Sequence, residues 1–170
     1  MDTKNKICAL SVSLLLALGS ALFGLEKGEA AARFANPDLD GKYVKGTDVI
    51  GKGWLLLDFF ATDCEPCKEE LPELEELHEQ FGEKGLTFIV FATDSAGSSI
   101  VKPYFQANPT AAVVVLDRYK MAAGRYGVDE IPSLFLVNPE GIIVEKAIGY
   151  NPETIAEIRS LLSQELASGT

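Results

Sequence analysis

The sequence predicts an α/β fold in which helices cover both faces of a central mixed sheet. Short apolar runs with the length of buried strands alternate along the chain with longer segments whose leucines and isoleucines recur at helical spacing. The chain has 170 residues, of which 47% are hydrophobic, so it is long enough to fill the core of one domain. No internal repeat and no low-complexity tract interrupts this pattern.

The first 32 residues have the features of a targeting segment. Lys4 and Lys6 precede an apolar run over residues 7–25, and the small residues at positions 28–32 offer a signal-peptide cleavage site. The apolar run is also just long enough to span a bilayer, so an uncleaved N-terminal membrane anchor is the alternative. Both alternatives predict export, and both leave a single domain over residues 33–170.

The strands are expected where apolar runs are bounded by turn residues. Arg33–Gly53 is rich in Asn, Asp, Pro and Gly, which predicts a β-hairpin, although composition alone also permits a flexible linker. Core strands are expected over residues 54–60, 86–92, 113–116, 133–137 and 142–148. The last two are joined by Asn138-Pro139-Glu140-Gly141, a sequence typical of a tight turn.

Helices are expected after Cys67, over residues 96–107 and 118–126, and from Pro152 onward behind an Asn151 cap. In the first helix, a leucine and phenylalanine stripe predicts the face that packs on the core; it consists of Leu71, Leu74, Leu77 and Phe81. Pro72 is expected to kink this helix. Its glutamates, Glu70 among them, are expected to form a solvated face.

Two cysteines lie at the junction between the strand over residues 54–60 and this helix. The helix dipole and the unpaired N–H groups at a helix N-terminus favour a thiolate, so Cys64 is predicted to be the nucleophile and Cys67 the resolving thiol. Pro66 stiffens the backbone between them. A turn of this size lets the pair open and close a small disulfide ring.

A structural disulfide and half of a zinc site are the alternatives to a redox-active cysteine pair. A second CxxC is missing and only His78 is available as a further histidine ligand, which argues against zinc. A structural bridge that closes so small a ring removes little chain entropy, so redox chemistry is favoured. We expect no metal and no cofactor. The formal net charge of −10 and the lack of a basic patch argue against nucleic-acid binding.

On these motifs the chain resembles the TlpA/ResA-like thioredoxin-fold thiol–disulfide oxidoreductases of the extracytoplasmic side of bacteria. The resemblance is carried by LLLDFFATDCEPCKEELP, by RYGVDEIPSLFLVNPEGIIVEKAIG and by the leading PDLDGKYV. It implies an N-terminal hairpin at a sheet edge and a helix-plus-strand insertion. Peroxiredoxins share this fold, but their Pro-x-x-x-Thr-x-x-Cys pattern is absent, because Thr62 lies only two residues before Cys64.

The resemblance also implies roles for Asp58 and Pro132. Asp58 lies inside an apolar strand, where a carboxylate is costly, and by resemblance it exchanges a proton with Cys67; an edge position that faces water is the alternative. By the same resemblance, the Ile131–Pro132 bond is cis and lies against the cysteines, and the backbone of Ile131 pairs with an extended substrate segment. Asp63, Glu65 and Pro66 are also expected to contact substrate.

Asp63 occupies the position before the first cysteine, where many of these relatives have tryptophan. Asp63 and Glu65 both disfavour a thiolate at Cys64, which predicts a low reduction potential and therefore a reductant. By resemblance, the expected substrates are disulfides in exported proteins such as apocytochrome c, and a membrane thiol donor returns the electrons. The expected location is the periplasm or the outer face of the membrane. The alternative function is a membrane-tethered, non-catalytic binding module with a structural disulfide.

Overall fold

Strand β3 (Trp54–Phe60) forms the centre of the sheet and is buried along its whole length. In the computed structural model, which describes residues 24–167, the strand order is β5-β4-β3-β6-β7. The other four strands are β4 (Leu86–Ala92), β5 (Val113–Leu116), β6 (Ser133–Val137) and β7 (Ile143–Ile148). Strands β3, β4 and β5 run parallel, and β6 and β7 complete the mixed sheet with antiparallel pairings.

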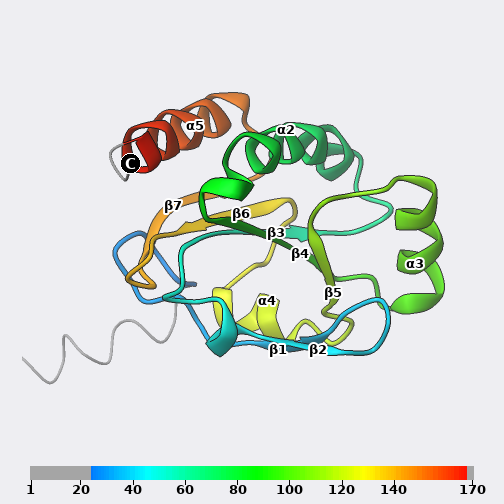
Figure 1. Cartoon of the computed structure of the whole chain (residues 1–170). Helices are drawn as coiled ribbons and strands as arrows, with labels where there is room; N and C mark the ends of the chain where they lie inside the picture. Colours follow the sequence, from blue (N-terminus) through cyan, green and yellow to red (C-terminus); the bar gives the residue numbers. More distant parts are fainter. Residues whose placement is uncertain (1–23, 168–170) are drawn as a thin grey trace, which may run out of the picture.

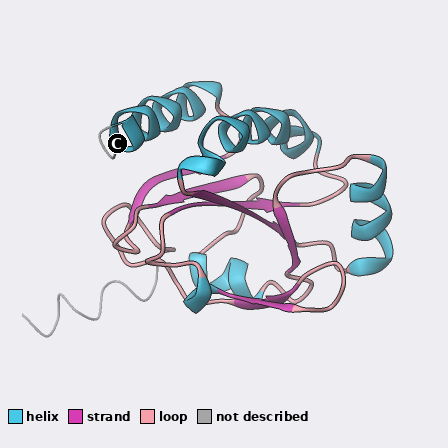
Figure 2. Cartoon of the chain, in the orientation of Figure 1, coloured by secondary structure: helices cyan, strands magenta, loops and turns pink. Residues whose placement is uncertain are grey.

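Helices cover both faces of this sheet (Figures 1 and 2). Helices α2 (Glu65–Phe81) and α5 (Pro152–Ala167) lie side by side on one face. The other face is covered by α4 (Met121–Tyr126) and by a hairpin of β1 (Ala35–Pro37) and β2 (Tyr43–Lys45). Helix α3 (Ser98–Ala107) lies beside the β5 edge (Figure 1), and two short 3-10 turns cover Gly46–Asp48 and Gly82–Lys84. The predicted thioredoxin-like fold is confirmed.

The alternation of side chains along β3 divides the core into two layers. Leu56 and Phe60 point to the α2–α5 side, whereas Leu57 and Phe59 point to the α4 side. Asp58 shares the parity of Leu56 and Phe60, so its carboxyl points to α2. This register places a carboxylic acid under the helix that carries the cysteines.

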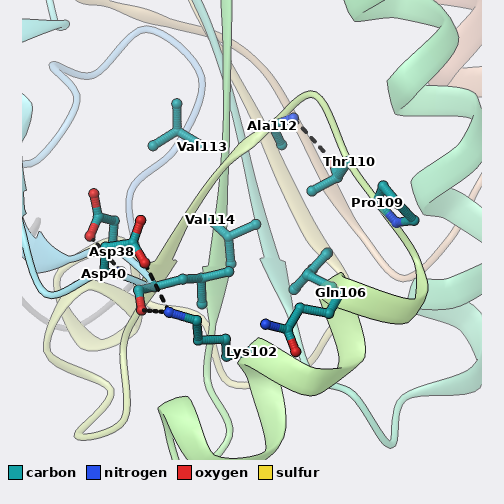
Figure 3. Close-up of a pocket in the computed structure, with 11 residues that line it drawn as sticks. Asp38, Asp40, Lys102, Gln106, Pro109, Thr110, Ala112, Val113 and Val114 are labelled. Carbon is teal, nitrogen blue, oxygen red and sulfur yellow. Dashed lines mark hydrogen bonds and ion pairs between the residues drawn. The ribbon is translucent and has the colours of Figure 1, made fainter.

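The N-terminal hairpin lies against the β5 edge, which rules out the flexible linker that composition alone permits. Strands β1 and β2 pair antiparallel, and Asp38 makes a β-bridge with Val115. Lys102 of α3 holds the hairpin turn through an ion pair of 2.9 Å with Asp40 (Figure 3). A pocket of about 380 Å³ lies between the hairpin, α3 and β5, and none of the predicted site residues lines it.

The predicted helix over residues 118–126 begins later, at Met121. Asp117 accepts hydrogen bonds from the backbone N–H groups of Ala122 and Ala123, and Lys120 has a left-handed backbone with a φ of 53°. The chain therefore makes a capped turn before the helix starts. Helix α2, by contrast, continues through Pro72 to Phe81.

Residues 24–32 belong to the packed structure. The Leu25 N–H donates to the Tyr126 carbonyl, and Ala30 makes a β-bridge with Ile142. Residues 24–32 thus pack with the domain predicted over residues 33–170, and the predicted targeting run before Gly24 lies outside the described residues. Within residues 24–167, no helix has the length and apolar character needed to cross a membrane.

Candidate active site

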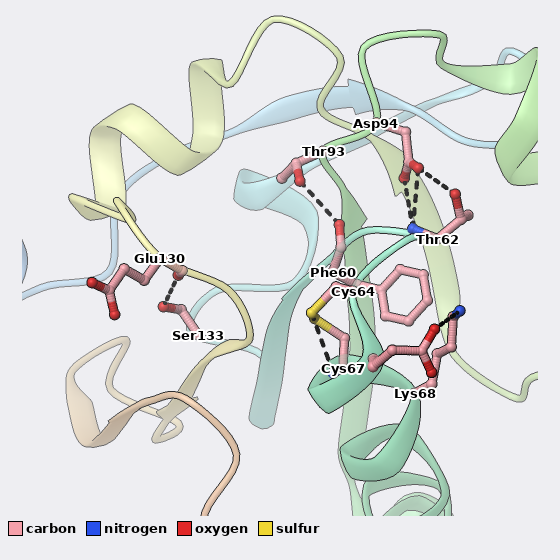
Figure 4. The surroundings of a disulfide bond; sticks show 10 residues. Phe60, Thr62, Cys64, Cys67, Lys68, Thr93, Asp94, Glu130 and Ser133 are labelled. Carbon is pink, nitrogen blue, oxygen red and sulfur yellow. Dashed lines mark hydrogen bonds and ion pairs between the residues drawn. A yellow bond between two sulfur atoms is a disulfide. The ribbon is translucent and has the colours of Figure 1, made fainter.

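Cys64 and Cys67 form a disulfide at the N-terminus of α2 (Figure 4). Their Sγ atoms are 2.03 Å apart, and the Cys67 backbone N–H donates to Cys64 Sγ over 3.3 Å. Cys64 is the N-cap of the helix and is partly exposed, whereas Cys67 is completely buried one turn later. The exposed sulfur is thus the one that a substrate can reach, and it lies where helix N–H groups stabilise a thiolate.

The loop before Cys64 is held by a buried aspartate that the sequence did not reveal. Asp94, at the end of β4, accepts hydrogen bonds from the Thr62 backbone N–H at 3.0 Å and from its hydroxyl at 2.5 Å (Figure 4). The Cys64 N–H donates to the Ala61 carbonyl, which closes the turn. Because Thr62 and Asp94 are far apart in sequence, only the parallel pairing of β3 and β4 brings them together.

The charges around Cys64 include a cation that the sequence analysis did not consider. Asp63, Glu65 and Pro66 are all exposed around the disulfide, but the Glu65 carboxylate makes a 2.7 Å ion pair with Lys68. The Lys68 ammonium partly offsets the charge of Glu65 and, more weakly, that of Asp63. The expectation that both carboxylates oppose a thiolate at Cys64 stays a prediction.

Asp58 is completely buried, and neither of its carboxyl oxygens has a hydrogen-bond partner among the described residues. The alternative of an edge position that faces water is wrong, because β3 is the central strand. Burial away from water penalises the ionised form and raises the pKa of Asp58 to about 7. A carboxyl with this pKa can both accept and donate a proton near neutral pH.

Glu70 is a second buried acid, and the expectation that it belongs to a solvated face is wrong. It is completely buried, and its carboxyl oxygens also lack hydrogen-bond partners among residues 24–167. Burial, followed by the nearby charges of Asp58 and Glu73, raises the pKa of Glu70 to about 9. Glu70 lies three residues after Cys67 and four before Leu74, so helical spacing places it on the core face. The spacing of Glu70 from Cys67 and Leu74 could therefore have predicted its burial from the sequence.

The Ile131–Pro132 peptide bond is cis, as expected. The start of β6 lies beside the end of β3 through the pairing of Ser133 with Phe59, and Ile131 packs against the core cluster that contains Cys67. The Ser133 hydroxyl donates to the Glu130 carbonyl over 2.7 Å and shapes this loop (Figure 4). The Gly149 N–H donates to the Pro132 carbonyl, so the loop after β7 is attached to the cis-proline loop.

The comparisons with known proteins agree with this geometry. Residues 27–146 match the family model described as the AhpC/TSA family. The chain belongs to the AhpC/TSA family. It is 32% identical to the thiol-disulfide oxidoreductase ResA of Bacillus anthracis over 86% of this chain and 90% of that protein. It is 31% identical to ResA of Bacillus subtilis over 88% of this chain and 82% of that protein.

Solved structures of thiol–disulfide oxidoreductases have the same fold as this chain. A thiol:disulfide interchange protein from Bacteroides sp. has a TM-score of 0.72 and 25% identity, with 86% of this chain and 93% of that chain covered. The thioredoxin domain of a thiol-disulfide oxidoreductase from Bacteroides vulgatus has a TM-score of 0.71 and 26% identity, with 81% and 99% covered. The chain is a ResA-like thiol–disulfide oxidoreductase, and Cys64 and Cys67 provide its redox-active pair.

Proposed function

We propose that this oxidoreductase works outside the cytoplasm as a reductant, and that its substrates are disulfides between the CxxCH cysteines of apocytochrome c. The observation that carries the proposal is the asymmetry of the cysteine pair: Cys64 is accessible at a helix N-terminus, and Cys67 is buried on the side of two acids. This arrangement suits an attacking thiolate on the outside and a resolving thiol on the inside.

In the reductive direction, the Cys64 thiolate attacks one sulfur of the substrate disulfide, and the other substrate sulfur leaves as a thiolate. Cys67 then loses its proton to a buried carboxylate and attacks Cys64 Sγ. This attack breaks the mixed disulfide, releases the second substrate sulfur, and forms the Cys64–Cys67 disulfide. Two electrons have then moved from the protein to the substrate.

The electrostatics of the pair favour this direction. Strong oxidants of this type owe their high potential to a stabilised reduced form with a very acidic nucleophilic thiol. Here Asp63 precedes the nucleophile, and Asp58 and Glu70 lie on the side of Cys67, where any ionised carboxylate opposes a thiolate. Destabilising the thiolates destabilises the reduced form, which lowers the reduction potential.

An apolar rim of exposed side chains beside the cis-proline supports a protein substrate. Ile131 is partly exposed before the cis-proline, and Ile148, which pairs with Ser133 at the end of β7, is 58% exposed. An extended segment of substrate is proposed to pair with the backbone of Ile131 while its side chains contact this rim. Pro132 has no backbone N–H, so it donates no hydrogen bond to the carbonyl oxygens of the substrate segment.

The N-terminal sequence supports a location outside the cytoplasm, because its basic residues and apolar run have the features of an export signal. We propose that electrons return from a membrane thiol donor, which reduces the Cys64–Cys67 disulfide by attack on the accessible Cys64 sulfur.

The direction is tested by equilibrating the protein with glutathione redox buffers. We expect a reduction potential below about −180 mV, the value of isomerases, and a higher potential would refute the reductant role. The substrate is tested with Cys67→Ala and an oxidised CxxCH peptide. The variant should trap the peptide as a mixed disulfide through Cys64, whereas a non-catalytic module with a structural disulfide would trap nothing. A peptide with both cysteines changed to serine is the control.

A further inference from the structure

The two buried acids under the disulfide have no direct contact with solvent. Asp58 is flanked across the sheet by Val90 and Leu134, and its oxygens and those of Glu70 are buried and without hydrogen-bond partners among the described residues. In the proposed exchange reaction, a proton moves onto and off this pair in every turnover. A buried acid that exchanges protons needs a polar group to connect it with water.

Glu73 lies one helical turn beyond Glu70 and is only partly buried. Side chains three positions apart on a helix are neighbours, and the Glu73 charge contributes to the raised pKa of Glu70. The hydroxyl of Tyr150 donates a hydrogen bond to the Glu73 carboxylate. This bond, with burial and the nearby glutamates, raises the pKa of Tyr150 to about 12, so the phenol keeps its proton near neutral pH.

Tyr150 also belongs to the loop that contacts the cis-proline loop. Its neighbour Gly149 donates to the Pro132 carbonyl, and Tyr150 packs against the core cluster that contains Cys67. The Glu73–Tyr150 pair is thus partly exposed, begins one helical turn after the buried Glu70, and is joined through Gly149 to the cis-proline loop.

Within residues 24–167, the elements around the acids other than α2 place no competing charge beside them. Strand β7 presents Ala147 to this side, while Lys146 lies over Phe135 on the opposite face of the sheet. Helix α5 presents apolar side chains, and its Arg159 bonds Gln80 and Glu76 further along α2. Among the described residues, the charges that act on Glu70 are those of Asp58 and Glu73, and those that act on Tyr150 are Glu73, Glu69 and Glu70.

We propose that Glu73 and Tyr150 form the relay through which the Asp58–Glu70 pair exchanges protons with solvent as the cysteines are oxidised and reduced. When Cys67 attacks Cys64 Sγ, its thiol proton moves to the buried pair. That proton then passes to the Glu73 carboxylate and to water, and reduction of the disulfide reverses the path. This inference rests on the thiol–disulfide exchange function and adds the route of the proton.

The relay is tested by stopped-flow oxidation of the reduced full chain with oxidised glutathione between pH 5 and 9. Tyr150→Phe keeps the ring and removes the hydrogen bond, and Glu73→Gln keeps the shape and removes the acid. Both variants are expected to slow formation of the Cys64–Cys67 disulfide by about tenfold at neutral pH. The solvent deuterium isotope effect is expected to rise, and imidazole at increasing concentration should restore the rate. Glu79→Gln, an exposed acid on the same helix, is the matched control.

Two outcomes overturn the inference. If both variants keep the wild-type rate and pH profile, the Glu73–Tyr150 bond carries no proton. If they are slower but show neither an isotope effect nor rescue by imidazole, the pair only positions the loop. A wild-type protein that exchanges no disulfide would instead refute the proposed function itself, so the two failures are distinguishable.

Discussion

At the residue scale, Asp58 and Glu70 are the least expected feature of this molecule. Carboxyl groups buried without hydrogen bonds cost stability, and two of them face the same apolar layer between β3 and α2. Neutral acids reduce that cost, which is why both pKa values are raised. Function is the simplest reason to keep them, since both lie on the side of the resolving cysteine.

The first prediction concerns stability and pH. The native state holds the protons of Asp58 and Glu70 above the pH at which the unfolded chain has lost them, so stability falls as pH rises from about 4 through the raised native pKa values. We expect the oxidised protein to lose at least about 2 kcal/mol between pH 5 and 9. Asp58→Asn and Glu70→Gln should each flatten that slope in urea unfolding, and Glu79→Gln should not. A slope that stays at the wild-type value in both variants would contradict the raised pKa values.

The second prediction concerns the Glu65–Lys68 ion pair. Lys68→Met leaves the Glu65 charge unopposed near Cys64, so the pKa of the Cys64 thiol should rise and the reduction potential should fall. Glu65→Gln frees the Lys68 ammonium and should shift both quantities the other way. Each change is expected to be about 10–30 mV, because the pair is at the surface. Iodoacetamide titration gives the thiol pKa, and shifts of the same sign in both variants would count against the argument.

At the element scale, the sequence was sufficient wherever an apolar run had sharp ends. The bounds of β3, β4, β5 and β6 agree with the prediction, because turn residues delimit each run. The start of α4 was not predictable, since it depends on the buried Asp117 and its contacts. Glu70 was missed for another reason. It is one of several glutamates in the same helix and was assigned with them to the solvated face, although its helical position places it on the core face.

The third prediction concerns the segment before the hairpin. Residues 24–32 contribute backbone hydrogen bonds to Tyr126, Gly141 and Ile143, and the Tyr126 hydroxyl donates to the Ala32 carbonyl. A chain that begins at residue 33 should therefore be less stable than one that begins at residue 24, by at least about 2 kcal/mol. Urea unfolding of the two oxidised chains measures the difference. Equal stabilities would mean that the segment adds nothing and that cleavage near residue 30 costs the fold nothing.

At the scale of the whole molecule, the sequence and the resemblance located the cysteines and the cis-proline. They did not predict the contact between Glu73 and Tyr150. Residue type and spacing identify Cys64 and Cys67, and the resemblance to the family identifies Pro132. The contact of Tyr150 with Glu73 joins segments far apart in sequence, and only the packing of the loop after β7 against α2 creates it.

Most of the negative charge of the chain lies on helices α2 and α5. Helices α2 and α5 carry ten glutamates against Lys68 and Arg159, which is a formal charge of −8 out of −10 for the chain. The nucleophile lies at one end of this acidic layer. Such a field attracts basic substrates and repels acidic ones, and salt screens it.

The last prediction follows from that field. Disulfide-bonded CxxCH peptides flanked by lysines should react with the reduced protein about ten times faster at 20 mM salt than the same peptides flanked by glutamates. At 500 mM salt the two rates should converge, because the screening length then falls to a few ångströms. Hydroxyethyl disulfide, which is neutral, serves as the control and should show almost no dependence on salt. If the glutamate peptides react as fast as the lysine peptides at low salt, contacts within the rim around Ile131 and Ile148 select the substrate, and the acidic layer does not.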